Sequence, residues 1–279
     1  MALGFSQRRL MVSGWAVQIA GYSIILIVAA SVLHRLFGLA TPVALNLYLL
    51  AFIGAGLAIV LAGYALLRIW QGGHRGTGSS LVAIALSSAI LMWPLSMLPK
   101  LQSLPNINDV STDTISPPPF VEIAKRRPAG SNPIEYDNAN FAEVQEKAYP
   151  DLRTLPVERS AAETVTLVAQ ALRKLRMEVV REAAPDRSTG LGFVEAVDRT
   201  LVFGFYDDVV VRVAENGVGA LVDVRSASRF GQHDLGANAT RVRKVLTALV
   251  ERIQATVPKK EERRKRRKKR RSKNRSNRS

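Results

Sequence analysis

Three long apolar stretches near the N-terminus constrain this chain more than any other feature. They cover about residues 13–33, 45–67 and 80–98. None of them contains Asp, Glu, Lys or Arg, and Trp or Tyr side chains lie near their ends, as is typical of helices that meet lipid headgroups. A helix needs about 20 apolar residues to cross a hydrocarbon core of ~30 Å. We therefore expect residues 1–99 to form an anchor of three transmembrane helices.

Two alternatives explain these stretches less well. A large soluble core would bury three apolar helices, but the rest of the chain has too little material to cover them. A cleaved signal peptide would begin with Arg8 and Arg9, but the apolar run behind them is too long and no small-residue cleavage site follows it.

Arginines in the short loops predict the orientation, because cytoplasmic loops are enriched in Lys and Arg. Arg8 and Arg9 precede the first stretch, Arg35 follows it, and Arg68 and Arg75 lie between the second and third stretches. This distribution favours an N-terminus inside the cell. We expect a multi-pass protein of the bacterial inner membrane whose soluble domain faces the periplasm. A domain that faces the cytoplasm is the alternative.

Small residues recur every four positions in the second stretch, at Gly54, Ala58 and Ala62. Such spacing lets helices approach closely. It serves either packing within the anchor or association of the chain with itself as a homo-oligomer. Since no ionisable residue lies in the middle of a stretch, a tether is a better interpretation than a transporter.

The C-terminal end is strongly basic. The whole chain carries a net charge of +16, and residues 259–279 contain fourteen Lys or Arg against two Glu. We predict that residues 257–279 form a disordered tail, because like charges repel one another along it. Its expected partners are polyanions, bound by counterion release. They are lipid headgroups or envelope polymers outside the cytoplasm, or nucleic acid if the tail faces the cytoplasm.

The absence of cysteine excludes disulfides, thiolate catalysis and cysteine metal sites. The three histidines are His34, His74 and His233, and the first two lie at the ends of the apolar stretches. A multi-histidine metal site is thereby excluded, and we expect no metal and no cofactor.

A proline-rich linker is predicted over residues 100–120, because the run from Pro117 to Pro119 favours an extended, stiff chain. Residues 121–256 then form the soluble domain. Ser160 and Glu163 make a capping box that begins an amphipathic helix, and Asn238 is expected to cap the last helix. Asn216-Gly217 indicates a tight hairpin.

The elements expected in this domain combine into an α+β fold. Extended segments or strands are expected at residues 152–157, 178–182, 191–197, 201–205 continuing through 208–213, and 220–229, with helices at 141–149, from 160 to about 176 and after 238. After the short first helix, the order is β-α-β-β-β-β-α. It favours an antiparallel sheet with helices on one face.

Several strings in the second half of the chain resemble one known family. They lie at residues 107–113 (INDVSTD), 117–120 (PPPF), 148–151 (AYPD), 204–208 (GFYDD), 223–229 (DVRSASR) and 234–239 (DLGANA). Because these strings occur in the expected order, the region from about 106 to 253 resembles the domain of unknown function 1499 family, which is found in bacterial envelopes and some plastids. The resemblance implies a domain that often follows membrane spans, and no activity.

Polar residues near the end of the predicted sheet form the candidate site. They are Asp207, Asp208, Arg225, Arg229, His233, Asp234, Asn238 and Arg241. Two arginines four positions apart on one strand face suit a phosphate or carboxylate, and a helix N-terminus adds unpaired N–H donors. The alternative is a structural network of Asp–Arg pairs, with Asp234 and Asn238 as turn and cap.

Catalysis is the rival hypothesis for the same region. His233 and Asp234 would supply a general base at the membrane surface. Asp207 and Asp208 are adjacent on a strand and point to opposite faces, so they do not form a carboxylate pair unless the backbone bends there. No nucleophile or phosphate-binding motif accompanies them. We therefore expect a non-catalytic domain that is associated with the cell envelope or binds a polar or anionic ligand.

Overall fold

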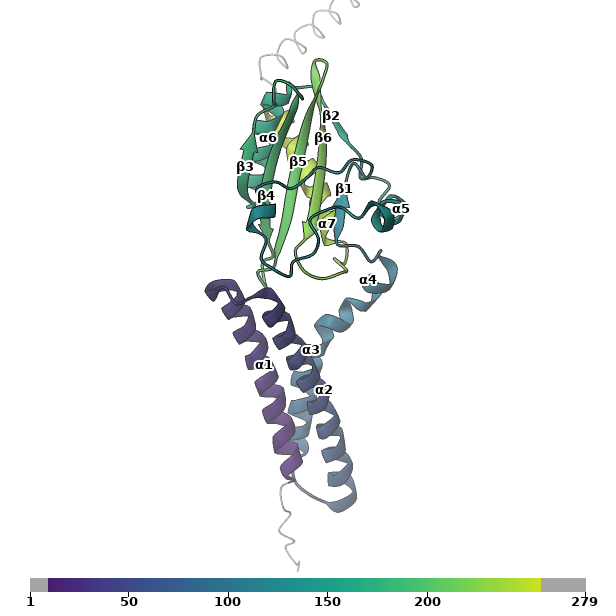
Figure 1. The fold of residues 1–279 in the computed structure, drawn as a ribbon. Helices are drawn as coiled ribbons and strands as arrows, with labels where there is room; N and C mark the ends of the chain where they lie inside the picture. Colours follow the sequence, from purple (N-terminus) through teal and green to yellow (C-terminus); the bar gives the residue numbers. More distant parts are fainter. Residues whose placement is uncertain (1–9, 257–279) are drawn as a thin grey trace, which may run out of the picture. The chain divides into compact units, whose positions relative to one another are not determined.

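The computed structural model describes residues 10–256 and divides the chain into two compact units (Figure 1). Among the described residues, the helical unit comprises residues 10–106 together with the loop Arg199–Tyr206, and the sheet unit comprises residues 107–198 and 207–256. The predicted basic tail over residues 257–279 lies outside the described residues.

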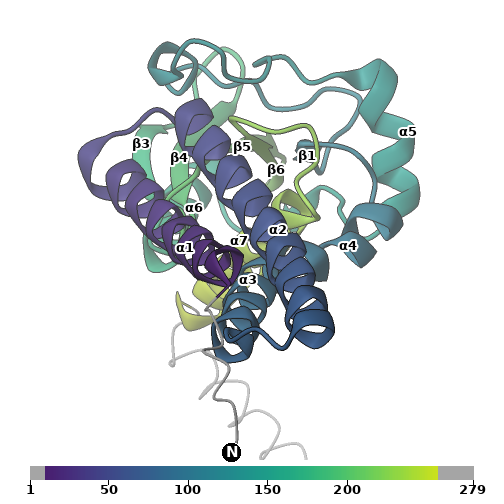
Figure 2. The same cartoon turned by 90° about the horizontal axis from the view of Figure 1, so that it is seen from below.

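The helical unit consists of the expected apolar helices. Its elements are α1 (Met11–Phe37), α2 (Thr41–Gly72), α3 (Thr77–Ser96) and the short α4 (Leu98–Ser103). Among the described residues, three helical segments are long and apolar enough to cross a membrane, which confirms the prediction of three apolar N-terminal helices. Figure 2 shows α1, α2 and α3 as neighbouring helices of one bundle.

The bundle buries its smallest side chains. The residues that α2 buries after its first position alternate in steps of four and three, and all but one are alanine: Ala44, Tyr48, Ala51, Ala55, Ala58, Ala62 and Ala65. Large apolar side chains such as Ile53 (59% exposed) and Val60 (67% exposed) point outward. This arrangement suits lipid, where close approach of the backbones drives association.

Packing inside the bundle accounts for the small residues at every fourth position of α2. Ala58 and Ala62 are completely buried. A Cβ atom added to Gly54 would lie 2.6 Å from the Ser23 hydroxyl of α1. Association between chains through these residues stays a prediction.

Residues 201–205, expected as part of a strand, are instead a loop. Strand β4 (Leu191–Arg199) ends before them and β5 (Tyr206–Asn216) begins after them. The reason is packing, because Phe203 and Phe205 lie against the aromatic ring of Tyr48 in the helical unit. Residues 201–205 are apolar without the regular alternation of a strand that has one buried face. This pattern agrees with a loop that packs on helices.

The sheet unit contains an antiparallel sheet and three α-helices among its described residues. Its remaining elements are β1 (Asp109–Ser111), η1 (Ala124–Arg126), α5 (Asn138–Ala148), β2 (Leu155–Val157), α6 (Ala161–Lys174), β3 (Glu178–Ala183), β6 (Gly219–Ser228) and α7 (Ala237–Thr256). The strand order is β1-β6-β5-β4-β3, with β2 paired to β6. The α+β class is confirmed, with β1 as an additional strand. Ser160 caps α6 through the Glu163 N–H, as the capping box predicts.

The structure departs from the predicted linker over the last two thirds of that segment. Residues from Ile107 onward belong to the sheet unit, and β1 pairs with β6 inside that stretch. Ile107, Val110 and Phe120 are buried. Their side chains fill the domain interior, which a linker would not do, and the proline run lies in a coil that covers the sheet.

The two faces of the sheet are covered in different ways. In Figure 1, α6 and α7 lie behind the sheet, and the coil between β1 and α5 crosses its front. We call these the helix side and the coil side. The helix side is apolar along the middle of β5 and β6, where Val209, Val211, Val222 and Val224 are buried, and it becomes polar toward Asp207 and Ser226. The coil side carries the residues between them, and many of these are charged.

Candidate functional site

The structure divides the predicted site residues between the two faces of the sheet. Asp207 and Asp208 are neighbours on β5, so their side chains point to opposite sides. Asp207 joins Asn238 and Arg241 on the helix side. Asp208 joins Arg229 on the coil side, where Arg225 also lies. The eight residues therefore do not line one common site.

Arg241 of α7 organises the helix-side cluster. Its Nε donates to Asp198 at 2.7 Å, and its Nη2 donates to Asp207. Its Nη1 donates to the side chains of Asn238 at 2.7 Å and Ser226 at 3.1 Å. Every guanidinium nitrogen thus has a partner inside the chain, and the cluster joins α7 to β4, β5 and β6. This is the structural network that the sequence left open as an alternative.

His233 and Asp234 act in the turn before α7. The two carboxylate oxygens of Asp234 accept the N–H groups of Gly236 and Asn238, each at 2.8 Å. The His233 Nδ1 accepts the Leu235 N–H at 2.9 Å. The carboxylate therefore orients the backbone, as a helix-capping group does. Burial raises the pKa of Asp234, and the two backbone N–H groups oppose that rise.

Asn238 does not cap the last helix, contrary to the prediction. It lies inside α7, and its buried side chain donates to the Asn108 carbonyl and to the Ser228 hydroxyl. Its Oδ1 accepts from Ser226. Asp234, three residues before the helix begins, supplies the capping carboxylate instead, because it accepts two backbone N–H groups.

Asp208 is the centre of the coil-side cluster. Its side chain is fully buried and accepts from two arginines. Arg229 donates to it through Nε at 2.9 Å and Nη2 at 2.7 Å. Arg127, from the coil, donates through Nε at 2.7 Å and binds the carbonyls of Asn132 and Pro133 through Nη1. One carboxylate therefore holds the arginine that directly follows β6 and an arginine of the coil.

Arg225 forms a second buried pair beside this cluster. Its Nε and Nη2 contact the carboxylate of Asp109, with Nη2 at 2.7 Å. The other donors bind the carbonyls of Pro118 and Ile134. The Phe120 ring lies 4.7 Å from the guanidinium. Burial raises the pKa of Asp109, and the Arg225 guanidinium opposes the shift.

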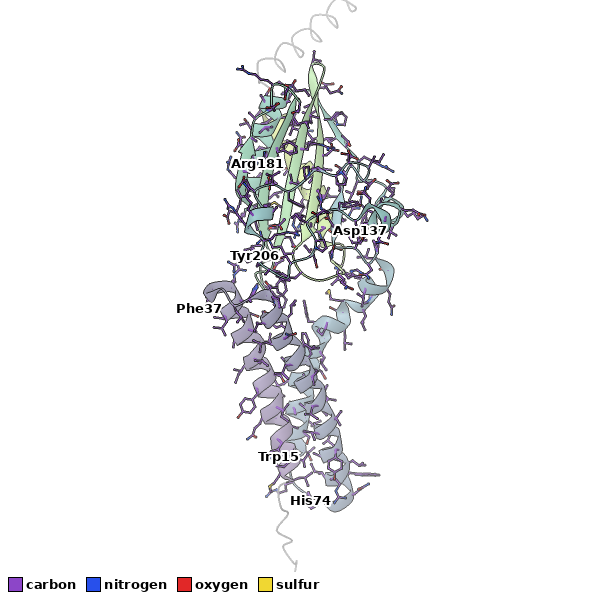
Figure 3. All side chains as sticks on the ribbon, viewed as in Figure 1. Trp15, Phe37, His74, Asp137, Arg181 and Tyr206 are labelled. Carbon is purple, nitrogen blue, oxygen red and sulfur yellow. The ribbon has the colours of Figure 1, made fainter. Side chains whose placement is uncertain are left out.

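Glu195 of β4 fastens the coil to the sheet. It is fully buried, and its carboxylate accepts the backbone N–H groups of residues 121, 122 and 123 at 2.9–3.1 Å. Arg181 of β3, labelled in Figure 3, donates to it at 3.0 Å. The carboxylate satisfies three donors that have no strand to pair with, and it thereby positions the segment that carries Arg127.

Arg127 has one nitrogen that is not used. Its side chain is 6% exposed, and Nη2 is buried without a hydrogen-bond partner among the described residues. The cluster of Arg127, Arg225 and Arg229 with Asp109 and Asp208 has three cations and two carboxylates, so one positive charge is in excess. We call these five residues the arginine cluster.

Sequence reasoning missed three residues of this face: Asp109, Arg127 and Glu195. Arg127 directly follows η1, and the exposed basic residues Lys125 and Arg126 before it look the same in sequence. Asp109 lies 116 positions before its partner Arg225. The one available signal for Glu195 is that it is the single charged residue between Leu191 and Val197.

A cavity of about 370 Å³ lies between α6 and α7, and none of the eight predicted residues lines it. It is lined by Lys174, Leu175, Thr240, Arg243, Lys244, Thr247, Ala248 and Glu251. Lys174 pairs with Glu251 across it, and Arg243 pairs with Asp151.

Comparisons with solved structures give low similarity. The vertebrate conserved region of human METTL16 has 10% identity and a TM-score of 0.25, covering 34% of this chain and 95% of that one. CalU16 from Micromonospora echinospora has 15% identity and a TM-score of 0.25, with 39% and 76% covered. TTHA0849 from Thermus thermophilus has 11% identity and a TM-score of 0.21, with 37% and 96% covered.

Comparison with curated proteins found no match. A family model described as "Protein of unknown function (DUF1499)" matches residues 109–249. That segment is half of the chain, and it contains the whole arginine cluster as well as β1. The expected resemblance is confirmed, and the chain belongs to the DUF1499 family.

Proposed function

We propose that this chain is a membrane-anchored, non-catalytic binding module whose arginine cluster takes an anionic group. The observation that carries the proposal is the buried Nη2 of Arg127, which has no partner among the described residues. A buried donor left without an acceptor costs about 1–3 kcal/mol. A phosphate or carboxylate oxygen supplies the missing acceptor and neutralises the excess charge of the cluster.

The surroundings of Arg127 support this role. Its Nη1 holds the carbonyls of Asn132 and Pro133, so the guanidinium lies under the loop 128–133. Residues 128–130 of that loop are exposed, and Gly130 has a φ of +79°. An anion enters where this loop moves aside. Charge-assisted bonds from a guanidinium are short and strong, so they suit such a ligand.

Placement at the outer side of the bacterial inner membrane belongs to the same proposal. Arg8, Arg9, Arg68 and Arg75 in short loops support an N-terminus inside and a periplasmic sheet unit. The ligand would then be a phosphate or carboxylate of the envelope. A cytoplasmic domain that tethers nucleic acid through its tail is the rival. An activity reporter fused at Ser279 separates the two, because a fusion active only in the cytoplasm overturns the outward placement.

A membrane-surface enzyme that uses His233 and Asp234 is the other rival. In a histidine–aspartate pair the carboxylate accepts the ring N–H. Here the carboxylate accepts two backbone N–H groups, and Nδ1 accepts a third from Leu235. This arrangement favours a turn and cap over a general base, and it supports the non-catalytic proposal.

Titration of the full-length protein in detergent tests the anion site. Inorganic phosphate and acetate are compared with chloride at equal ionic strength, using calorimetry and the thermal midpoint. We expect Arg127→Gln to weaken binding about tenfold or more, since a charged hydrogen bond contributes about 1.5–3 kcal/mol. The matched control is Lys125→Gln, whose side chain is 66% exposed.

Three outcomes decide the proposal. Binding that is lost in Arg127→Gln and kept in Lys125→Gln supports it. Equal binding by all three proteins places the anion elsewhere and overturns it. A wild-type protein that responds to phosphate and acetate no more than to chloride also overturns it, and the arginine cluster is then structural alone.

A further inference from the structure

The loop Arg199–Tyr206 joins two strands of the sheet yet belongs to the helical unit. Phe203 lies 5.0 Å from the ring of Tyr48 and 5.0 Å from that of Trp93. Phe205 lies 5.3 Å from the ring of His34. These partners come from the last turns of α1 and α3 and from the start of α2. The loop therefore packs on one end of the bundle, where all three helices contribute.

Polar contacts fix the backbone of the loop to the same end. His34 Nδ1 contacts the Phe203 carbonyl at 2.7 Å. Arg35 Nη1 donates to the Thr200 carbonyl at 2.9 Å, and Arg199 Nη2 donates to the Arg35 carbonyl. Irregular backbone is tolerated close to hydrocarbon where its carbonyls have protein partners. These contacts provide such partners.

The tip of the loop is apolar and uncovered. Leu201 is 81% exposed and Val202 is 69% exposed. At the end of α1, Leu36 and Phe37 are 70% and 74% exposed. Figure 3 shows Phe37 and Tyr206 at one end of the helical unit and Trp15 at the other. Polar residues usually dominate a hairpin turn in water, so this tip has an unusual composition.

We infer that the loop Arg199–Tyr206 lies in the lipid interface, with Leu201 and Val202 inserted among the acyl chains. The partner is a bilayer surface, because the tip is continuous with helix ends whose large apolar side chains also lack protein cover. Tyr48 and Trp93 are residue types that occur at the headgroup level. Arg35 and Arg199 flank the tip at that level, and the segment from Thr200 to Phe205 has no charge. The loop is thus a fourth contact of the helical unit with the membrane.

The absence of cysteine from the chain makes a direct test possible. Leu201→Cys and Val202→Cys each introduce one thiol for an environment-sensitive fluorophore. The full chain is reconstituted in vesicles of phosphatidylcholine and phosphatidylglycerol. Quenching by iodide in water is then compared with quenching by a quencher on the acyl chains. The matched control is Val218→Cys, which lies in the β5–β6 hairpin and is fully exposed. Phe37→Cys marks the end of a helix.

We expect the acyl-chain quencher to act mainly on labels in the loop Arg199–Tyr206, and iodide to act mainly on the label in the β5–β6 hairpin. Labels at 201 and 202 resemble the label at 37, with acyl-chain quenching several-fold above that at 218 and iodide quenching several-fold below it. Labels at 201 and 202 that iodide quenches as well as the label at 218 overturn the inference. Quenching is measured only on labelled protein that elutes in size-exclusion chromatography as the wild type does. The use of two adjacent positions ensures that the test does not depend on one misfolded variant. This inference stands independently of the arginine cluster.

Discussion

The two units of this protein fill their interiors with different sets of side chains. The bundle of α1, α2 and α3 buries Ala and Ser and turns Leu, Ile and Val outward, whereas the sheet unit buries Val and Leu together with charged residues. Water drives large apolar side chains inward, because their burial removes apolar surface from it. Lipid gives no such drive, so the bundle interior is left to the residues that permit the closest backbone approach. The solvent of each unit can therefore be inferred from what the unit buries.

A second contrast separates the two faces of the sheet. The helix side is covered by regular helices, in which backbone N–H and C=O groups form hydrogen bonds with one another. The coil side is covered by a segment with little regular structure, and charged side chains of the sheet supply its missing hydrogen bonds. Glu195, Asp208 and Arg225 are the main examples. Buried ion pairs on this face compensate for the absence of secondary structure in its cover.

Removal of the Asp208 charge should lower the free energy of unfolding more than any other change, since this carboxylate pairs with both Arg127 and Arg229. Asp208→Asn leaves two buried guanidinium groups without their carboxylate, and breaking a buried pair costs about 3–5 kcal/mol. Denaturant unfolding monitored by circular dichroism measures the change. The control is Asp151→Asn, an exposed pair with Arg243 that is worth about 0–1 kcal/mol. Equal losses in the two variants would contradict the special role of the coil side.

Neutralisation of Glu195 should loosen the coil more than the sheet. Glu195→Gln keeps the size of the side chain but weakens charge-assisted bonds to three backbone N–H groups, for a loss of about 1.5–3 kcal/mol. Hydrogen exchange is expected to accelerate at amides 121–123 while amides of β5 keep their protection. Uniform acceleration across both segments would mean that the coil and the sheet open together. Glu182→Gln, at a more exposed pair on β3, serves as the control.

Enlargement of the bundle interior tests the contrast between the units. Ala58→Leu inserts three carbons at a completely buried position, and overpacking costs about 1–3 kcal/mol. Its neighbour Leu57 is 49% exposed, and Leu57→Ala should change stability by less. Thermal unfolding in detergent, followed by helical circular dichroism, compares the two. If Leu57→Ala were the more damaging variant, the large side chains would be the true core.

The smallest expected effect is a pH dependence from Asp234. Its pKa in the folded state is raised by burial above the ordinary value of 3.8, so the folded protein retains the proton longer than the unfolded chain. Stability contributed by this proton is present below the unfolded pKa and is lost as the pH rises through the raised folded pKa. Asp234→Asn should remove that loss. The difference in unfolding free energy between variant and wild type, measured from about pH 3.5 upward, should shift in favour of the variant. A constant difference would exclude the effect.

Local patterns predicted the helices and the antiparallel sheet class well, because hydropathy, the Ser160–Glu163 capping box and the Asn216-Gly217 turn act over a few residues. The arginine cluster could not be predicted in the same way. Asp208 meets Arg127 across 81 positions and Asp109 meets Arg225 across 116, and one partner of each pair lies outside the periodic strands of the hairpin. The proline run near Pro118 resembled a linker because coil that is pinned by side chains has no periodicity of its own. Asp207 and Asp208 were separated correctly, since alternation along a strand is itself a local rule.

The pairing of β1 with β6 has a consequence for the time course of synthesis. Val110 pairs with Ser226, so the first strand leaves the ribosome more than one hundred residues before its partner. At roughly 5–20 residues per second, that interval lasts about 6–23 s. Throughout it, β1 and the coil that follows have no sheet on which to dock, while the apolar helices before them have already been made. A chaperone that acts on this protein should therefore bind nascent chains in which β1 has left the ribosome and β6 has not, and should release them once β6 has emerged.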